Sequence, residues 1–185
     1  MSYPEALLVG EREYEINTSY EDALACIACI NDTTLSEAER AYGVLEILYK
    51  EDPEDKIEAT RMAVKYLQLG KESPAEDAPP PDMDYEYDMH YIRSSFRSDY
   101  GIDLNQTAGM HWWEFMELLQ GLTDKCILNR IRDLRTYDIT SVKDLKTRAK
   151  IIRAQREVAL PKKLDQEEQD TLDAFFAQLG TPAEE

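Results

Sequence analysis

The chain of 185 residues is poor in the residues that usually carry catalysis or bind cofactors. It has two histidines, three cysteines and seven glycines. The glycines are scattered, so the sequence contains neither a glycine-rich phosphate loop nor a nucleophile elbow of the G-x-S-x-G type. Two histidines are too few for a multi-histidine metal site. We therefore expect a protein that is not an enzyme and that needs no cofactor or metal.

Basic residues and long apolar runs are also scarce. The 21 Lys and Arg residues stand against 38 Asp and Glu, for a formal net charge of −17. Binding to nucleic acid through a broad basic face is disfavoured, because phosphate contacts need Lys and Arg, and binding to an anionic membrane surface is disfavoured for the same reason. No run approaches about 18 apolar residues, and the N-terminal residues do not form a basic region followed by an apolar run. We expect neither a membrane span nor a secretory signal.

An odd number of cysteines in a chain without a secretory signal indicates a reducing compartment and no disulfide framework. Cys26 and Cys29 form a C-x-x-C pair, a spacing found in metal and redox sites. The pair lies in a small apolar run that predicts a helix, and the remaining candidate ligands (His90, His111 and Cys126) have no paired spacing. The favoured interpretation is a pair of cysteines packed in the core.

Charge is distributed unevenly along the chain. Residues 1–89 have 7 basic and 22 acidic side chains, residues 90–163 have 14 basic and 9 acidic, and residues 164–185 have 7 acidic and none basic. Basic helices that pack against acidic ones within the molecule are the favoured explanation. The alternative is a basic face that binds an acidic protein partner.

The predicted fold is mainly α, with an N-terminal β-hairpin packed on a multi-helix bundle. An apolar run, Gly10 and an alternating segment predict the hairpin over residues 7–16. Four prolines between residues 71 and 83 predict an acidic, partly extended linker. The expected organisation is therefore a hairpin with helices over 1–70, the linker over 71–83, a helical segment over 84–162, and an acidic C-terminal helix and tail over 163–185. Whether the two halves pack together is left open.

Helix-capping residues divide the first half into three helices. Ser19 is placed to cap a helix through residue 30, and Ser36 with Glu39 forms a capping box. Asp52 and Pro53 predict the start of a third helix, which Gly70 ends. Helical spacing predicts the apolar faces of the second and third helices: Ala38, Tyr42, Leu45, Leu48 and Tyr49, and then Ile57, Thr60, Val64 and Leu67.

The second half also contains residues that are typical of helix starts and helix ends. A helix ends at Gly101, a compact one covers residues 111–120, the next starts at Thr123 or Asp124, a basic helix covers 141–160, and a last helix starts at Asp165. Spacing predicts the structural core of this half: Ile92, Phe96, Tyr100, Trp112, Phe115, Met116 and Leu119. His111 beside Trp112 is interpreted as a structural polar group.

Acidic residues alternate with apolar ones at the start of the second half, at Asp82, Asp84, Glu86 and Asp88. Clustered carboxylates are compatible with a cation site. However, the segment lacks the glycine and the twelfth-position glutamate of an EF-hand loop. A solvated, acidic helix start is favoured, because acidic residues there interact well with the helix dipole.

A family resemblance becomes visible in the second half. The run from Asp84 to Ile92, the segment from Asp99 to Leu104, the H-W-W-x-F motif at His111 and the L-Q-G-L motif at Leu119 occur together. Further matching motifs lie near Tyr14 and Leu45. Together they resemble the "gp fifteen" proteins of siphophages that infect low-GC Gram-positive bacteria, over residues 5 to about 162.

The resemblance implies a role in tail morphogenesis. Proteins of this family are typically encoded between the major tail protein and the tape measure protein, where tail assembly chaperones are found. Such chaperones bind the helical, aggregation-prone tape measure protein, help tail-tube subunits polymerise, and are usually absent from finished virions. The implied partners are the tape measure protein and the major tail protein, and the implied location is the cytoplasm of the host bacterium. Nothing in the sequence indicates an oligomeric state.

Aromatic and basic residues supply the candidate binding surface for such a partner. Trp113 points away from the helix face formed by Trp112 and Phe115, because successive helical residues are about 100° apart. The hypothesis is that Trp113 and Tyr91, with the basic helix, bind the partner; the basic residues are Lys143, Lys146, Lys150 and Arg153. The alternative is that Trp113 packs within the molecule. Competing functions are a minor structural component of the tail and an acidic, host-directed adaptor.

Overall fold

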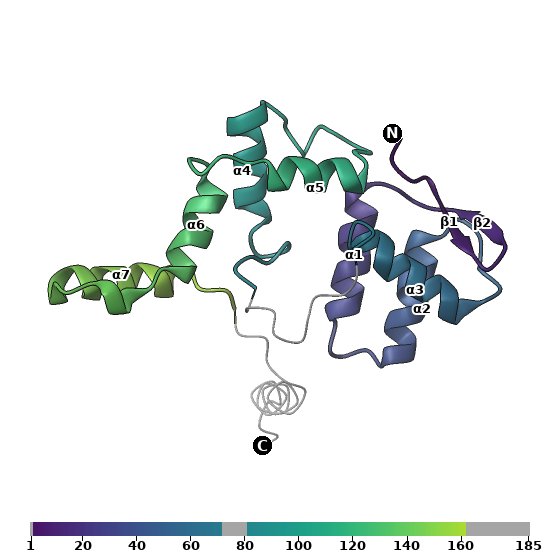
Figure 1. Cartoon of the computed structure of the whole chain (residues 1–185), viewed down its shortest axis with the longest axis horizontal. Coiled ribbons are helices and arrows are strands. Elements are labelled where there is room, and N and C mark those ends of the chain that lie inside the picture. Colours follow the sequence, from purple (N-terminus) through teal and green to yellow (C-terminus); the bar gives the residue numbers. More distant parts are fainter. Residues whose placement is uncertain (1, 72–80, 162–185) are drawn as a thin grey trace, which may run out of the picture.

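The structure, a computed structural model, describes residues 2–71 and 81–161 (Figure 1). In these ranges the chain forms a two-stranded sheet, seven α-helices and one 3-10 helix, in the order β1-β2-α1-α2-α3-α4-α5-α6-η1-α7. This confirms the mainly α fold with an N-terminal hairpin that the sequence predicts. Most of the predicted linker and the whole of the predicted last helix lie outside the described residues.

The hairpin joins β1 (Ala6–Val9) and β2 (Arg12–Glu15). Gly10 in the turn has a φ of 62°, a left-handed conformation that glycine adopts without strain. Leu7 pairs with Tyr14 across the ladder, and both side chains are buried. Because an isolated hairpin is only marginally stable in water, this burial against the helices holds it in place.

Three helices complete the first half: α1 (Tyr20–Asn31), α2 (Glu37–Leu48) and α3 (Lys56–Leu67). The Ser19 hydroxyl accepts a hydrogen bond from the Asp22 amide, and Ser36 with Glu39 forms the capping box, as predicted. A side-chain oxygen at these positions satisfies amides that have no partner inside the helix, so each cap is a local signal.

The predicted start of α3 is wrong, and of its predicted inward face Leu67 is buried whereas Ile57 is exposed. The helix begins at Lys56 with Asp55 as its N-cap, and Pro53 is buried outside it. Its buried residues are Ala59, Ala63, Tyr66 and Leu67, whereas Ile57 is 86% exposed. Small alanines let neighbouring elements approach closely, and this close packing outweighs the burial of one larger side chain. Tyr42 of the predicted α2 stripe is likewise 59% exposed.

The second half contains α4 (Met89–Tyr100), α5 (Trp112–Gln120), α6 (Ile127–Thr136), η1 (Ile139–Ser141) and α7 (Leu145–Glu157). Gly101 ends α4 as predicted, with a φ of 71°. The predicted start of α6 is wrong, because its N-cap is Cys126, while Thr123 is bonded to Asp99. α7 is shorter than the predicted basic helix, since Asp144 caps it.

The two halves share one hydrophobic core, which settles what the sequence left open. The Tyr20 and Phe115 rings stack with 4.7 Å between their centroids. The Trp112 indole Nε1–H donates to the Leu67 carbonyl at 3.1 Å. The buried cluster is continuous from Leu7 in β1 to Leu128 in α6. By contrast, α7 has no buried residue and extends from the end of α6 (Figure 1).

Candidate functional site

The predicted structural residues lie on the inner faces of α4 and α5. The buried ones are Ile92, Phe96, Trp112, Phe115 and Leu119. Met116 and Tyr100 are partly buried and pack against the same cluster. The Phe115 ring stacks on Phe96 and Trp112 as well as on Tyr20. Spacing along each helix is therefore sufficient to find this set.

Trp113 packs within the molecule. Its Nε1–H donates to the Tyr66 carbonyl at 3.2 Å, and its ring stacks on the Tyr66 ring. The helix start beneath it is fixed by His111, whose Nδ1 accepts the Trp113 amide at 3.0 Å while Nε2 lies 3.0 Å from the Pro4 carbonyl. His111 is thus a polar cap that joins α5 to the N-terminal segment.

The candidate binding residues do not form one surface. Trp113 contacts the end of α3, and Tyr91 is partly buried in the first turn of α4. Lys143, Lys146, Lys150 and Arg153 are exposed on or just before α7, which packs on α6 and η1. In Figure 1 the start of α5 lies beside α1, whereas α7 projects from the opposite side of α5.

A large apolar groove lies between α1 and residues 84–89, a feature that the sequence analysis missed. Its volume is about 910 Å³. The floor and walls come from Leu24, Ile27, Ala28, Tyr85 and Met89, with further lining residues at the C-terminal end of α1. Asp32, Asp84 and Glu86 add acidic groups to the lining. The sequence signal for this groove is that the helix around Cys26 and Cys29 has apolar residues on more than one face, so one apolar face is left uncovered.

A second, smaller groove lies between α2 and α3. Its volume is about 440 Å³, and Ala38, Tyr42, Leu45 and Ile57 line it. Tyr42 and Ile57 are the side chains that the spacing predicted to be inside. Because these two side chains are exposed, the surface between α2 and α3 is apolar.

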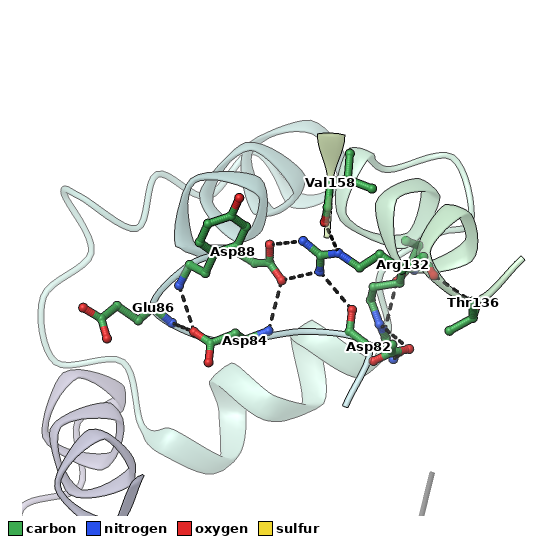
Figure 2. Close-up of polar contacts among 10 residues, drawn as sticks. Asp82, Asp84, Glu86, Asp88, Arg132, Thr136 and Val158 are labelled. Atoms are coloured by element: carbon green, nitrogen blue, oxygen red, sulfur yellow. Dashed lines mark hydrogen bonds and ion pairs between the residues drawn. The ribbon is translucent and has the colours of Figure 1, made fainter. Parts of the chain in front are cut away.

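The acidic run at the start of the second half is tied into the fold. Asp88 is fully buried, so a solvated helix start is the wrong interpretation for this residue. Its carboxylate accepts hydrogen bonds from the Asp84 amide at 3.0 Å and from both terminal nitrogens of Arg135. Figure 2 shows Asp88 and Asp84 at the centre of this network, with Val158 beside it.

Arg135 ties four segments together. Besides Asp88, the guanidinium donates to the Asp82 carbonyl at 2.9 Å and to the Val158 carbonyl at 2.6 Å. Hydrogen bonds to the Asp88 carboxylate raise the pKa of Arg135 above its ordinary value, so the group stays charged. Arg132 forms a second pair with the Asp82 carboxylate at 3.1 Å. Some acidic residues of the first part of the chain therefore pair with basic residues of the second part within the molecule.

The cysteines are free thiols. Cys26 and Cys126 are buried and Cys29 is partly buried. Burial raises the pKa of the Cys26 thiol to about 12. Within residues 2–71 and 81–161 no three His, Cys, Asp or Glu side chains are placed to hold a metal ion together. None of the helices described is both long and apolar enough to cross a membrane.

Comparison with known proteins identifies the family of the chain. No curated protein and no solved structure matches it significantly. The family model described as "Bacteriophage Gp15 protein" matches residues 4–160. This range includes the hairpin, the seven α-helices of the described residues, both grooves and the Asp88–Arg135 pair. The chain therefore belongs to the bacteriophage Gp15 protein family.

Proposed function

We propose that this phage protein is a non-catalytic tail-assembly chaperone that binds helical segments of the tape measure protein in the cytoplasm of the host bacterium. The major tail protein is the second proposed partner. Membership of the family makes the chain a phage protein, and the likeness of its motifs to siphophage proteins suggests the tail role. The single observation that carries the proposal is the open apolar groove between α1 and residues 84–89.

The groove has the chemistry needed to hold one face of an amphipathic helix. Such a helix lays apolar side chains at positions i, i+3 and i+4 into an apolar groove. Leu24, Ile27 and Met89 supply the apolar contacts, and Asp32 and Glu86 favour basic residues on the flanks of the guest helix. The groove is open to solvent, so binding is expected to be reversible, as a chaperone requires.

The acidic surface suits the same task. A net charge of −17 keeps a protein with exposed apolar surfaces soluble through self-repulsion. A guest that aggregates through its apolar helix faces would gain the same protection while it is bound. The groove and the net charge thus support a holding function without any catalytic group.

Co-expression with the tape measure protein tests the proposal directly. We expect the wild-type chain to increase the soluble fraction of the tape measure protein and to co-purify with it. Ala28→Glu places a charge in the groove from an exposed position of α1, and it should abolish both effects. Ala38→Glu, at an exposed position in the smaller groove, is the matched control and should retain them. Loss of both effects in the Ala38 variant alone would place the site elsewhere.

Mass spectrometry of purified particles separates this function from its two competitors. A chaperone should be absent from virions, whereas a minor tail component would be present in fixed copy number. An acidic host-directed adaptor would instead be recovered with basic host proteins and released by salt. Either result would contradict the chaperone proposal.

A further inference from the structure

Within the described residues, a groove lies where α7 meets α6, η1 and Pro81. Ile152, Ala159 and Leu160 line a groove of about 460 Å³ with Ile139, Pro81 and the stems of Arg135 and Arg156. On a helix, Leu145, Arg148, Ile152 and Arg156 follow one another at intervals of three or four residues, so they share one side of α7, and of these Ile152 and Arg156 line the groove. This surface, the α7 groove face, alternates apolar and basic groups.

A second row of positive charge runs beside the α7 groove face. Lys146, Lys150 and Arg153 share the adjacent side of the helix, again at intervals of four and three residues. Arg153 pairs with Glu157 at 3.1 Å. Within the part of the chain that the structure describes, no acidic side chain lies within ion-pair distance of Lys146, Lys150 or Arg156. An occupant of this surface should therefore carry apolar and acidic groups together.

The end of this chain has that composition. Residues 164–185 contain seven acidic side chains and no basic one, with Leu172, Phe175, Phe176 and Leu179 as large apolar residues. Leu160 lines the groove, so the remaining residues start at its edge. A segment tethered beside its site has an effective concentration of the order of millimolar, which favours it over a separate acidic chain.

We propose that residues 164–185 bind the α7 groove face of the same chain, with their apolar side chains in the groove and their carboxylates on Lys146, Lys150, Arg148 and Arg156. This inference concerns a different surface from the groove between α1 and residues 84–89, so it stands or falls independently of the proposed function.

Hydrogen exchange of the full-length protein, followed by mass spectrometry, tests the inference. The test variant neutralises five acidic residues near the start of the segment: D165N, E167Q, E168Q, D170N and D173N. We expect amides of α7 to exchange about tenfold faster in this variant, because the ordering that a tethered ligand provides is lost. Unchanged exchange in α7 would overturn the inference.

A control variant removes the same amount of charge from exposed positions in the hairpin, α2 and loops: E11Q, E13Q, E46Q, E54Q and D124N. It should leave exchange in α7 unchanged, since the effect depends on where the charge is. Equal acceleration in the control would mean that net charge alone explains the result, which would contradict the inference.

Two further experiments identify what occupies the α7 groove face: charge reversal on both sides of the contact, and dilution of the protein. Replacing Lys146, Lys150 and Arg156 by Glu should accelerate exchange in α7, and adding Lys at the five acidic positions of the segment should restore protection. Protection should not change between about 1 and 100 μM protein, because the contact lies within one chain. Protection that falls on dilution would assign the surface to a second copy and overturn the inference. If the variant with charges exchanged on both sides does not regain protection in α7, the inference is also overturned.

Discussion

Arg135 forms a two-pronged ion pair with Asp88, with Nη1 2.6 Å from Oδ2 and Nη2 2.7 Å from Oδ1. The Asp88 side chain is completely buried, and that of Arg135 is 7% exposed. The pair joins the start of α4 to α6, and through the Val158 carbonyl it also holds the end of α7. This geometry gives the buried carboxylate a full set of hydrogen-bond partners.

Removal of either partner should destabilise the fold strongly. Asp88→Asn or Arg135→Met leaves an uncompensated buried group, and we expect a loss of about 3–5 kcal/mol in the free energy of unfolding. Denaturant titration followed by tryptophan fluorescence measures it. Asp133→Asn, an exposed change in α6, should cost less than about 0.5 kcal/mol. A loss of under about 1 kcal/mol in both partner variants would show that the pair is not needed for stability.

The adjacent tryptophans should differ in their contribution to stability. Trp112 is 1% exposed and bonds to the Leu67 carbonyl, whereas Trp113 is only partly buried and bonds to the Tyr66 carbonyl. Trp112→Ala removes a core side chain and should cost about 3–5 kcal/mol, and Trp113→Ala should cost less. Unfolding curves of the two variants make the comparison. An equal or larger loss for the Trp113 variant would contradict the packing described here.

Trp113 also bears on partner binding. Because its indole N–H and ring are engaged with Tyr66, we expect Trp113→Phe to keep most of the capture of the tape measure protein in a co-purification assay. If a folded Trp113→Phe variant loses capture while Ala28→Glu retains it, the sequence-based hypothesis for Trp113 is favoured over the α1 groove.

Gly43 allows α1 and α2 to approach closely. A Cβ at this position would lie 2.6 Å from the Cys29 Sγ. Gly43→Ala should therefore destabilise the wild-type chain by about 1–2 kcal/mol. With Cys29→Ala in place the clash is gone, and the same change should stabilise the helix by up to about 1 kcal/mol. A double-mutant cycle of unfolding free energies tests this reversal of sign, and additivity of the two changes would exclude the close contact.

Cys26 should be protected from thiol reagents in the folded protein. Its pKa is raised to about 12 by burial, so almost no thiolate exists at pH 8. Partly buried Cys29 should be alkylated first, with Cys26 modified only on unfolding. Peptide mass spectrometry after timed alkylation distinguishes them. Faster modification of Cys26 than of Cys29 would show that α1 opens locally.

The raised pKa of Cys26 also has a consequence for stability. Above the ordinary thiol pKa of 9.0 the unfolded chain loses this proton while the folded chain keeps it up to about 12. The contribution of the protonated Cys26 thiol to the free energy of unfolding is thus fully present below pH 9 and declines as the pH rises from 9 toward 12. In denaturant titrations at a series of pH values, Cys26→Ala should therefore show a smaller decline in the free energy of unfolding between pH 9 and 12 than the wild-type chain. An unchanged alkaline slope in the variant would contradict the assignment.

Local signals account for the features that the sequence determined on its own. Ser19, the Ser36–Glu39 box and Gly101 act within one turn of the helix they bound, so each could be recognised without knowledge of its neighbours. The inner faces of α4 and α5 were predictable because large apolar residues there leave only one face to bury. The family resemblance rested on motifs in the same part of the chain, including the one that starts at His111.

Tertiary packing decided the rest. Ile57 lies outside because α3 packs through Ala59 and Ala63, a choice that depends on how near the neighbouring elements come. Asp88 lies inside because Arg135, 47 residues away, neutralises it, and no local pattern shows such a partner. The groove between α1 and residues 84–89 likewise exists only once the two halves share a core. Caps and spacing act within a few residues, whereas burial and surface shape depend on contacts between segments far apart in the chain.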